Sequence, residues 1–142
     1  MIALVYVAGS SKEIERVRVV QKRIQESSFL DPVPGGDWTE FIEAEQAGKP
    51  DRTAAQCARA DIDAIDRSSL LFAVWPVYSE PSKGLCFEIG YALARKKTIV
   101  LWDFELEALK SGFIFAALPG IVVESNLDRA IAFASGWAYA KP

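Results

Sequence analysis

Short apolar runs alternate with segments of helical periodicity along most of this chain. The apolar runs cover residues 2–8, 30–33, 70–76, 98–103 and 120–124. Apolar side chains recur at helical spacing over residues 12–27, 53–68, 84–96 and 126–136. Strands that are apolar throughout and alternate with helices are typical of a parallel sheet covered on both faces. The pattern therefore predicts an α/β fold, a three-layer flavodoxin-like or Rossmann-like sandwich around a five-stranded parallel sheet.

Two stretches are less regular than the rest. Residues 29–51 contain several prolines and glycines and predict only a partial helix over 37–47. Residues 104–119 lead into the last strand without a clear period. The chain has no internal repeat, low-complexity tract or linker-like segment, so residues 1–142 are expected to form a single domain.

Composition and charge narrow the class of protein. Hydrophobic residues make up 51% of the chain and charged residues 25%, which is typical of a globular protein. The net charge is -3 and the 16 basic residues are scattered over the helices, which argues against binding to a nucleic-acid polymer. The chain has neither a signal-peptide pattern nor a run of about 18 apolar residues. We expect a cytoplasmic protein that does not bind membranes, with Cys57 and Cys86 reduced on the buried sides of helices.

The chain contains no histidine. Catalytic triads that use histidine and histidine metal sites are therefore excluded. Neither GxGxxG nor GxxxxGK[ST] occurs, so a dinucleotide or P-loop site has little support, and we expect no cofactor and no metal. Any acid–base chemistry must be carried by carboxylates.

Two carboxylates occupy positions where an amphipathic helix normally places apolar residues. Glu88 falls at the edge of the apolar arc of its helix, and Asp61 lies in the middle of an apolar face. An ionised carboxylate that loses its hydration costs several kcal/mol unless it is compensated, so a functional site is one explanation. The other, for Glu88, is an acid near a helix start, which the macrodipole stabilises by roughly 0.3–1 kcal/mol.

The predicted sheet would bring these acids together with polar residues from its loops. Ligands of such folds bind where the strands end at their carboxyl side, and Tyr6 and Ser10 belong to the end of the first strand. Residues 77–83 follow a later strand, and Glu88 lies on the helix after them. Residues 9–12 and 81–84 could each bind an anion, although Ser10 could equally cap a helix. We expect these segments to converge on one crevice.

Three pieces of the sequence resemble the nucleoside 2-deoxyribosyltransferase family. They are Tyr6-Val-Ala-Gly9-Ser10, Asp61, and Gly84-Leu-Cys-Phe-Glu88-Ile-Gly90-Tyr-Ala92. The resemblance implies that Glu88 is the nucleophile that attacks the anomeric carbon of the sugar, that Asp61 contacts and protonates the leaving base, and that Tyr6 orients Glu88. It also implies that the substrate is bound by four further residues, Gly9, Ser10, Ser82 and Gly84. An apolar site should favour a protonated Asp61, whereas the helix dipole and a phenol donor should favour an ionised Glu88.

The sequence departs from the transferase pattern at several positions. Ser82 stands where those enzymes usually carry an aspartate, Leu85 replaces a threonine, and residues 113–118 lack the asparagine that reaches a neighbouring subunit's site. Ser82 and the Gly9-Ser10 turn are instead similar to the related nucleoside 5′-monophosphate N-glycosidases, because a serine does not repel phosphate as an acid does.

Several functions are consistent with this resemblance. Transfer of a deoxyribosyl group from a nucleoside or nucleotide to a free base is the leading one, and hydrolysis of a deoxynucleoside 5′-monophosphate is the alternative. A catalytically silent nucleotide-binding domain and a TIR-like NAD glycohydrolase are weaker candidates. We also expect a homodimer or higher homo-oligomer, because the peripheral segments carry many apolar side chains. These are Phe104, Phe113, Ile114, Phe115, Leu118 and Trp137.

Overall fold

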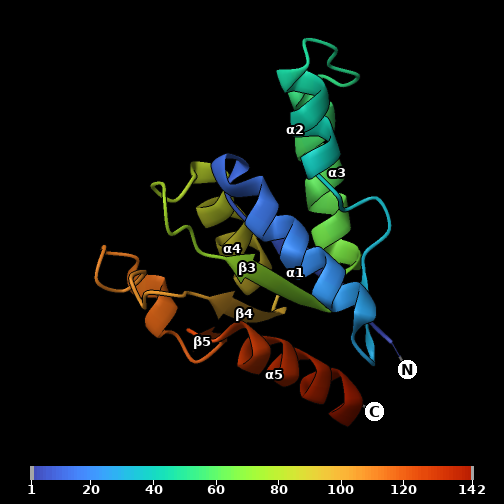
Figure 1. The fold of residues 1–142 in the computed structure, drawn as a ribbon. Helices are drawn as coiled ribbons and strands as arrows, with labels where there is room; N and C mark the ends of the chain where they lie inside the picture. The colour runs from blue at the N-terminus through green and yellow to red at the C-terminus, as the bar shows by residue number, and fades with distance from the viewer. Residues whose placement is uncertain (1, 142) are drawn as a thin grey trace.

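Five parallel strands form the central sheet, in the order β2-β1-β3-β4-β5 (Figure 1). The computed structural model describes residues 2–141. The strands are β1 (Ala3–Ala8), β2 (Leu30–Pro32), β3 (Leu70–Val74), β4 (Thr98–Trp102) and β5 (Ile121–Glu124). The predicted α/β sandwich with a five-stranded parallel sheet is confirmed, and its strand order is the flavodoxin-like one.

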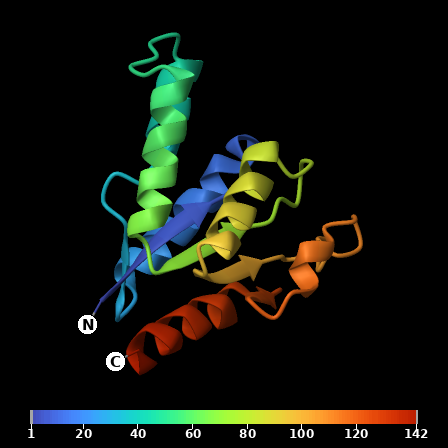
Figure 2. The ribbon, with the colours of Figure 1, turned by 180° about the vertical axis from the view of Figure 1, so that it is seen from behind.

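Helices cover both faces of the sheet and make a three-layer sandwich. The elements are η1 (Ser11–Glu13), α1 (Ile14–Glu26), α2 (Thr39–Gln46), α3 (Ala54–Arg67), α4 (Lys83–Ala94), η2 (Ile114–Ala117) and α5 (Leu127–Ala140). In Figure 1, α1 lies in front of the sheet with α5 below it, and Figure 2 shows α3 and α4 from the opposite side. Arg23 of α1 pairs with Asp128 of α5 at 2.7 Å, which joins the two helices of one layer.

The core lies between the central strands and these helices. All five residues of β3 are buried, as are Val5 to Ala8 of β1. Successive side chains of a strand point to opposite faces, and Val5 and Val7 lie toward α1. Tyr6 therefore points to the face covered by α3 and α4, where it is completely buried.

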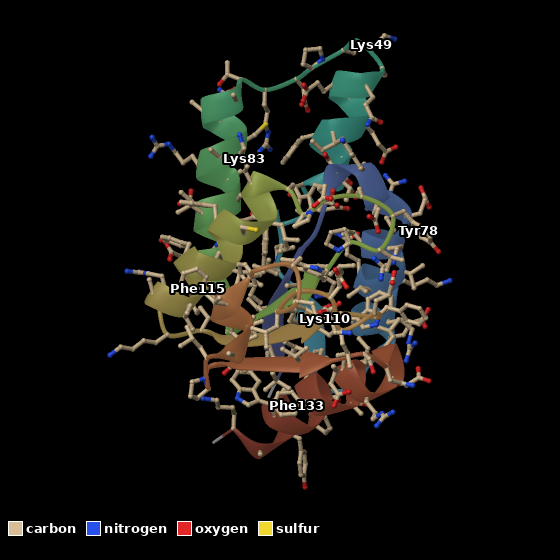
Figure 3. The ribbon with its side chains drawn as sticks, turned by 90° about the vertical axis from the view of Figure 1, so that its left-hand side faces the viewer. Lys49, Tyr78, Lys83, Lys110, Phe115 and Phe133 are labelled. Atoms are coloured by element: carbon tan, nitrogen blue, oxygen red, sulfur yellow. The ribbon has the colours of Figure 1, made fainter. Side chains whose placement is uncertain are left out.

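The strand order changes direction between β1 and β3. The chain passes from β1 outward to β2 on one side, whereas β3, β4 and β5 follow on the other side. The connections at the carboxyl ends of β1 and β3 therefore separate, which creates the crevice where ligands of such folds bind. Figure 3 looks onto the side of the molecule where these strands end.

Helices α2 and α3 form a hairpin that projects beyond the sheet (Figure 1). Thr53 begins α3 with a capping box, since its side chain accepts from Gln56 and its backbone donates to Gln56 in return. The apolar face predicted for this helix is buried only near its end, at Ala64 and Ile65, whereas Ala54 and Ala58 are exposed. The reason is that the sheet does not extend beneath the first half of α3.

Two details differ from the sequence-based expectations. Cys57 and Cys86 are half-buried and do not lie in the core, because each sits at the margin of its helix's packed face. Helix α5 continues past Gly136 to Ala140, since Ala138 packs into the core beyond the glycine. Among the helices of residues 2–141, none is long and apolar enough to cross a lipid bilayer.

Candidate active site

A cavity of about 430 Å³ opens between the α2–α3 hairpin and the start of α4. It lies beside the carboxyl ends of β1 and β3, where the strand order predicts a ligand site. Its lining residues are Gly9, Ser11, Trp38, Ile42, Ala58, Asp61, Ile62, Ile65, Ser82, Gly84, Leu85, Phe87 and Glu88. Both of the carboxylates singled out in the sequence therefore face one space.

Tyr6 and Glu88 form a short hydrogen bond at the wall of this cavity. The Tyr6 hydroxyl donates to Glu88 Oε2 at 2.5 Å, although the residues lie 82 positions apart in the chain. Tyr6 lies on strand β1, and Glu88 lies on the second turn of α4. Burial, with smaller effects of Glu88 and Asp61, raises the pKa of Tyr6 well above its ordinary value, so the phenol remains a proton donor.

Burial raises the pKa of Glu88 from 4.5 to about 8. The Tyr6 hydrogen bond acts in the opposite direction, and the nearby Asp61 charge adds to the rise. The expectation that Glu88 is ionised in the free site is therefore wrong. Its physical reason is that desolvation outweighs the phenol, and Glu88, as the sixth residue of α4, lies beyond the turn where a helix dipole acts strongly.

Asp61 faces the same cavity from α3. Burial raises its pKa from 3.8 to about 6, and the Arg52 charge opposes this rise. The direction agrees with the expectation of a protonated Asp61, but Glu88 holds its proton to a higher pH. Between about pH 6 and pH 8 the two carboxyls together therefore carry one proton.

The two predicted serines have different positions. Ser82 lines the cavity and its Oγ accepts a hydrogen bond from the Leu85 amide at 3.1 Å, so it also caps α4. Ser10 is buried, and its Oγ accepts from the Lys12 amide at 3.3 Å as the cap of η1. The capping alternative for Ser10 is thus the one seen in the structure. Ser11, which belongs to the same predicted anion-binding segment of residues 9–12, lines the cavity instead.

Gly9 and Gly84 both line the cavity but for different steric reasons. A Cβ at Gly9 would overlap Val17 Cγ2, so this glycine allows α1 to approach the end of β1. A Cβ at Gly84 would have no heavy atom within 4 Å, so no neighbour requires glycine there. Gly84 leaves open space at the start of α4.

An apolar wall opposite Glu88 was not found by sequence reasoning. It contains Trp38 and Ile42 around α2, Ile62 on α3, and Phe87 on α4. Trp38 is held in place because its Nε1 donates to the Val7 carbonyl at 2.8 Å. The only sequence signal was the weak helical period of residues 37–47, which gave no direction for the side chains.

The described residues offer little for a metal ion. Within residues 2–141, no group of three or more His, Cys, Asp or Glu side chains is arranged to hold one. Lys12 and Lys83, which could neutralise an anion, do not line the cavity itself. Figure 3 shows Lys83 beside α4 and the hairpin, with Tyr78 on the other side near α1.

One protein family and two solved structures are similar to this chain. Residues 5–130 match the family model described as nucleoside 2-deoxyribosyltransferase. A 2-desoxiribosyltransferase from Leishmania mexicana has a similar structure, with a TM-score of 0.60, 19% identity, and coverage of 94% of this chain and 97% of that chain. A CMP N-glycosidase from Clostridium botulinum gives a TM-score of 0.49 at 22% identity, covering 94% and 98% of the two chains. The comparison with curated proteins gave no match.

The fold and the family match define an enzyme of the glycosyltransferase class that acts on nucleosides. The model match extends over most of the chain, from β1 into α5. The chain belongs to the nucleoside 2-deoxyribosyltransferase family.

The raised pKa of Glu88 predicts a pH-dependent loss of stability. Between about pH 4.5 and 8 the unfolded chain releases this proton while the folded protein keeps it, so the free energy of unfolding falls as the pH rises through this window. Glu88→Gln should remove this part of the slope and be more stable than the wild type at pH 8. Urea unfolding at pH 5, 6.5 and 8 measures it, with Glu80→Gln on an exposed loop as the control. Parallel slopes in wild type and Glu88→Gln would contradict the assignment.

Proposed function

We propose that this enzyme cleaves the N-glycosidic bond of a (2′-deoxy)nucleoside or nucleotide, with Glu88 as the nucleophile, and transfers the deoxyribosyl group to another base. The observation that carries the proposal is the Tyr6–Glu88 hydrogen bond at the wall of a cavity that also contains Asp61. A nucleophile and the group that orients it are expected within hydrogen-bond reach of each other. The chemistry requires no histidine.

The two carboxyls divide the proton work between them. In the reactive arrangement Glu88 is ionised and the single proton of the pair resides on Asp61. The Glu88 carboxylate forms a bond to the anomeric carbon while the carbon–nitrogen bond breaks, and the electron pair leaves with the base. Asp61 donates its proton to that base. A second base, or water, then gives a proton to the Asp61 carboxylate as it attacks the anomeric carbon, and the bond to Glu88 breaks so that Glu88 leaves as a carboxylate.

The shape of the cavity supports an orientation of the substrate. An apolar wall suited to the flat face of a base is formed by Trp38, Ile42 and Ile62. Asp61 lines the same cavity. Glu88 and Tyr6 lie where the sugar would be. Ser82 and Gly84, at the start of α4, are then left for the 5′ end of the substrate, where unsatisfied backbone amides favour an anion.

This last feature favours a second candidate function, hydrolysis of a deoxynucleoside 5′-monophosphate. A serine at position 82 tolerates phosphate, and Gly84 leaves room beside it. Transfer remains the leading proposal because Tyr6, Asp61 and Glu88 all match the transferase pattern. A catalytically silent nucleotide-binding domain would leave the Tyr6–Glu88 pair without a role.

Replacing the nucleophile should abolish turnover but not binding. Glu88→Gln keeps the side-chain shape and a partner for Tyr6, so the fold should persist while turnover falls by roughly 10³-fold or more. Intact-mass measurement of enzyme mixed with a deoxynucleoside should detect a deoxyribosyl adduct on the wild type alone. Asp61→Asn is the companion variant, and it should slow natural bases more than activated leaving groups. Normal turnover by Glu88→Gln would refute the proposal.

Position 82 should decide between nucleoside and nucleotide. If Ser82 and the start of α4 receive a 5′-phosphate, a deoxynucleoside 5′-monophosphate should react faster than its nucleoside, since each charged hydrogen bond contributes roughly 1.5–3 kcal/mol. Ser82→Asp should reverse the preference by repulsion while still capping α4. Product analysis with and without added free base measures both the preference and the outcome. A wild type that prefers the nucleoside and is accelerated by free base is a transferase in which Ser82 serves only as a cap.

We also propose that the protein is at least a dimer. The segment between β4 and β5, together with η2, exposes several large apolar side chains, and a sizeable exposed patch usually marks an association surface. They are Phe104, Leu106, Leu109, Ile114, Phe115 and Leu118. Figure 3 shows Phe115 on the side where the strands end, together with Lys110. Light scattering at micromolar concentration should give at least twice the 15.6 kDa of one chain, and a monomeric mass would contradict this.

A further inference from the structure

The loop between β3 and α4 is held by a carboxylate from another part of the chain. Glu13, at the end of η1, accepts hydrogen bonds from the Val77 amide at 3.0 Å, the Tyr78 amide at 3.1 Å and the Ser79 hydroxyl at 2.5 Å. Its side chain is only 5% exposed. A buried carboxylate is expensive unless it is fully paired, so these contacts are unlike those of an ordinary surface acid.

Arg16 completes the pairing of this carboxylate. Its Nη1 lies 3.0 Å from Glu13 Oε1 and donates to the Trp75 carbonyl at 2.9 Å. The guanidinium also lies over the Trp102 ring, 4.5 Å from its centre. Burial alone would raise the pKa of Glu13, but its hydrogen bonds outweigh this and lower the pKa below the ordinary value. The carboxylate is therefore charged at neutral pH.

This arrangement is the main anchor of the loop in the described structure. Within residues 2–141, the hydrogen bonds that residues 77–79 donate all end on Glu13. The loop then continues through Pro81 to Ser82, which lines the cavity and caps α4. Glu13 comes two residues after Ser11, which also lines the cavity. One carboxylate thus joins the two segments that border the start of α4.

We propose that Glu13 is a positioning residue that fixes the spacing between Ser11 and Ser82, and thereby shapes the part of the site that binds the 5′ end of the substrate. The inference rests on the proposed function. Glu88 is oriented separately by Tyr6, which is buried in β1, so loss of the Glu13 contacts should weaken substrate binding and leave the chemical step nearly unchanged. Tyr6→Phe should show the opposite pattern.

The test compares three variants in the full-length protein. Glu13→Gln removes the charge and replaces an acceptor with a donor that faces the loop amides. Ser79→Ala removes one hydrogen bond to Glu13 and keeps the ion pair between Glu13 and Arg16. It is the variant to use if Glu13→Gln fails to fold. Glu15→Gln is the matched control, because Glu15 is an exposed acid two residues away that pairs only with Arg18 among the described residues.

Two measurements are made on each variant. Hydrogen exchange of the Val77 and Tyr78 amides reports on anchoring, and the Kd and kcat for a deoxynucleoside 5′-monophosphate report on the site. Glu13→Gln should accelerate exchange and raise Kd roughly tenfold, the loss expected for a charged hydrogen bond, with kcat within about threefold of the wild type. Ser79→Ala should change both readouts in the same direction by less, and Glu15→Gln should change neither.

The outcomes separate this inference from the proposed function. Faster amide exchange with an unchanged Kd would overturn it, because the loop would then be anchored without effect on the site. A fall in kcat at constant Kd would also overturn it, because Glu13 would then act on the chemical step. If the wild type binds the nucleotide without turning it over, the proposed reaction fails and the Kd values still decide the role of Glu13. If the wild type binds only the unphosphorylated nucleoside, this inference fails, whereas transfer from a nucleoside stands.

Discussion

The burial of one carboxyl group beside a tyrosine hydroxyl is the interaction on which the site depends. A carboxyl in this position gains a hydrogen bond from Tyr6 but loses most of its hydration. The loss of hydration has the larger effect on its pKa. The result is a carboxyl that keeps its proton at neutral pH, and in the proposed reaction Glu88 acts as the nucleophile only after losing this proton. Asp61, the second carboxyl in the same cavity, is the group through which the proton of the pair can be redistributed.

The sheet provides the fixed geometry for this pair. Tyr6 pairs with Leu71 of β3, and the preceding residue Val5 pairs with Pro32 of β2 on the other side of β1. Helix α4 packs against the same central strands, so the positions of phenol and carboxyl are determined by the best-buried part of the molecule. Groups that must stay within about 0.5 Å of a working geometry are best placed on rigid elements, and this site follows that rule.

Much of the fold could be predicted from the sequence because its signals are strong and local. Apolar strands and helical periods gave every strand and the main helices, and the misplaced acids Asp61 and Glu88 indicated the cavity. The apolar wall around Trp38 and Ile42 could not be predicted, because residues 29–51 have no strong period and their packing depends on distant contacts. The sequence also could not predict which of the two acids has the higher pKa, since this depends on how far burial outweighs a single hydrogen bond. Nothing in the sequence distinguishes Glu13 from other acids near a helix start, because its hydrogen-bond partners lie more than 60 residues away along the chain.

The projecting hairpin separates two tasks that many enzymes combine on the same elements. The apolar wall of the cavity is carried largely by α2 and α3, outside the sheet, whereas Tyr6 lies on a central strand and Glu88 on α4, which packs against the sheet. Substitutions at Ile42 or Ile62 change the lining of the cavity without disturbing the register of any strand. Under the proposed function, the choice of base can therefore be altered on the hairpin alone while the Tyr6–Glu88 pair keeps its geometry.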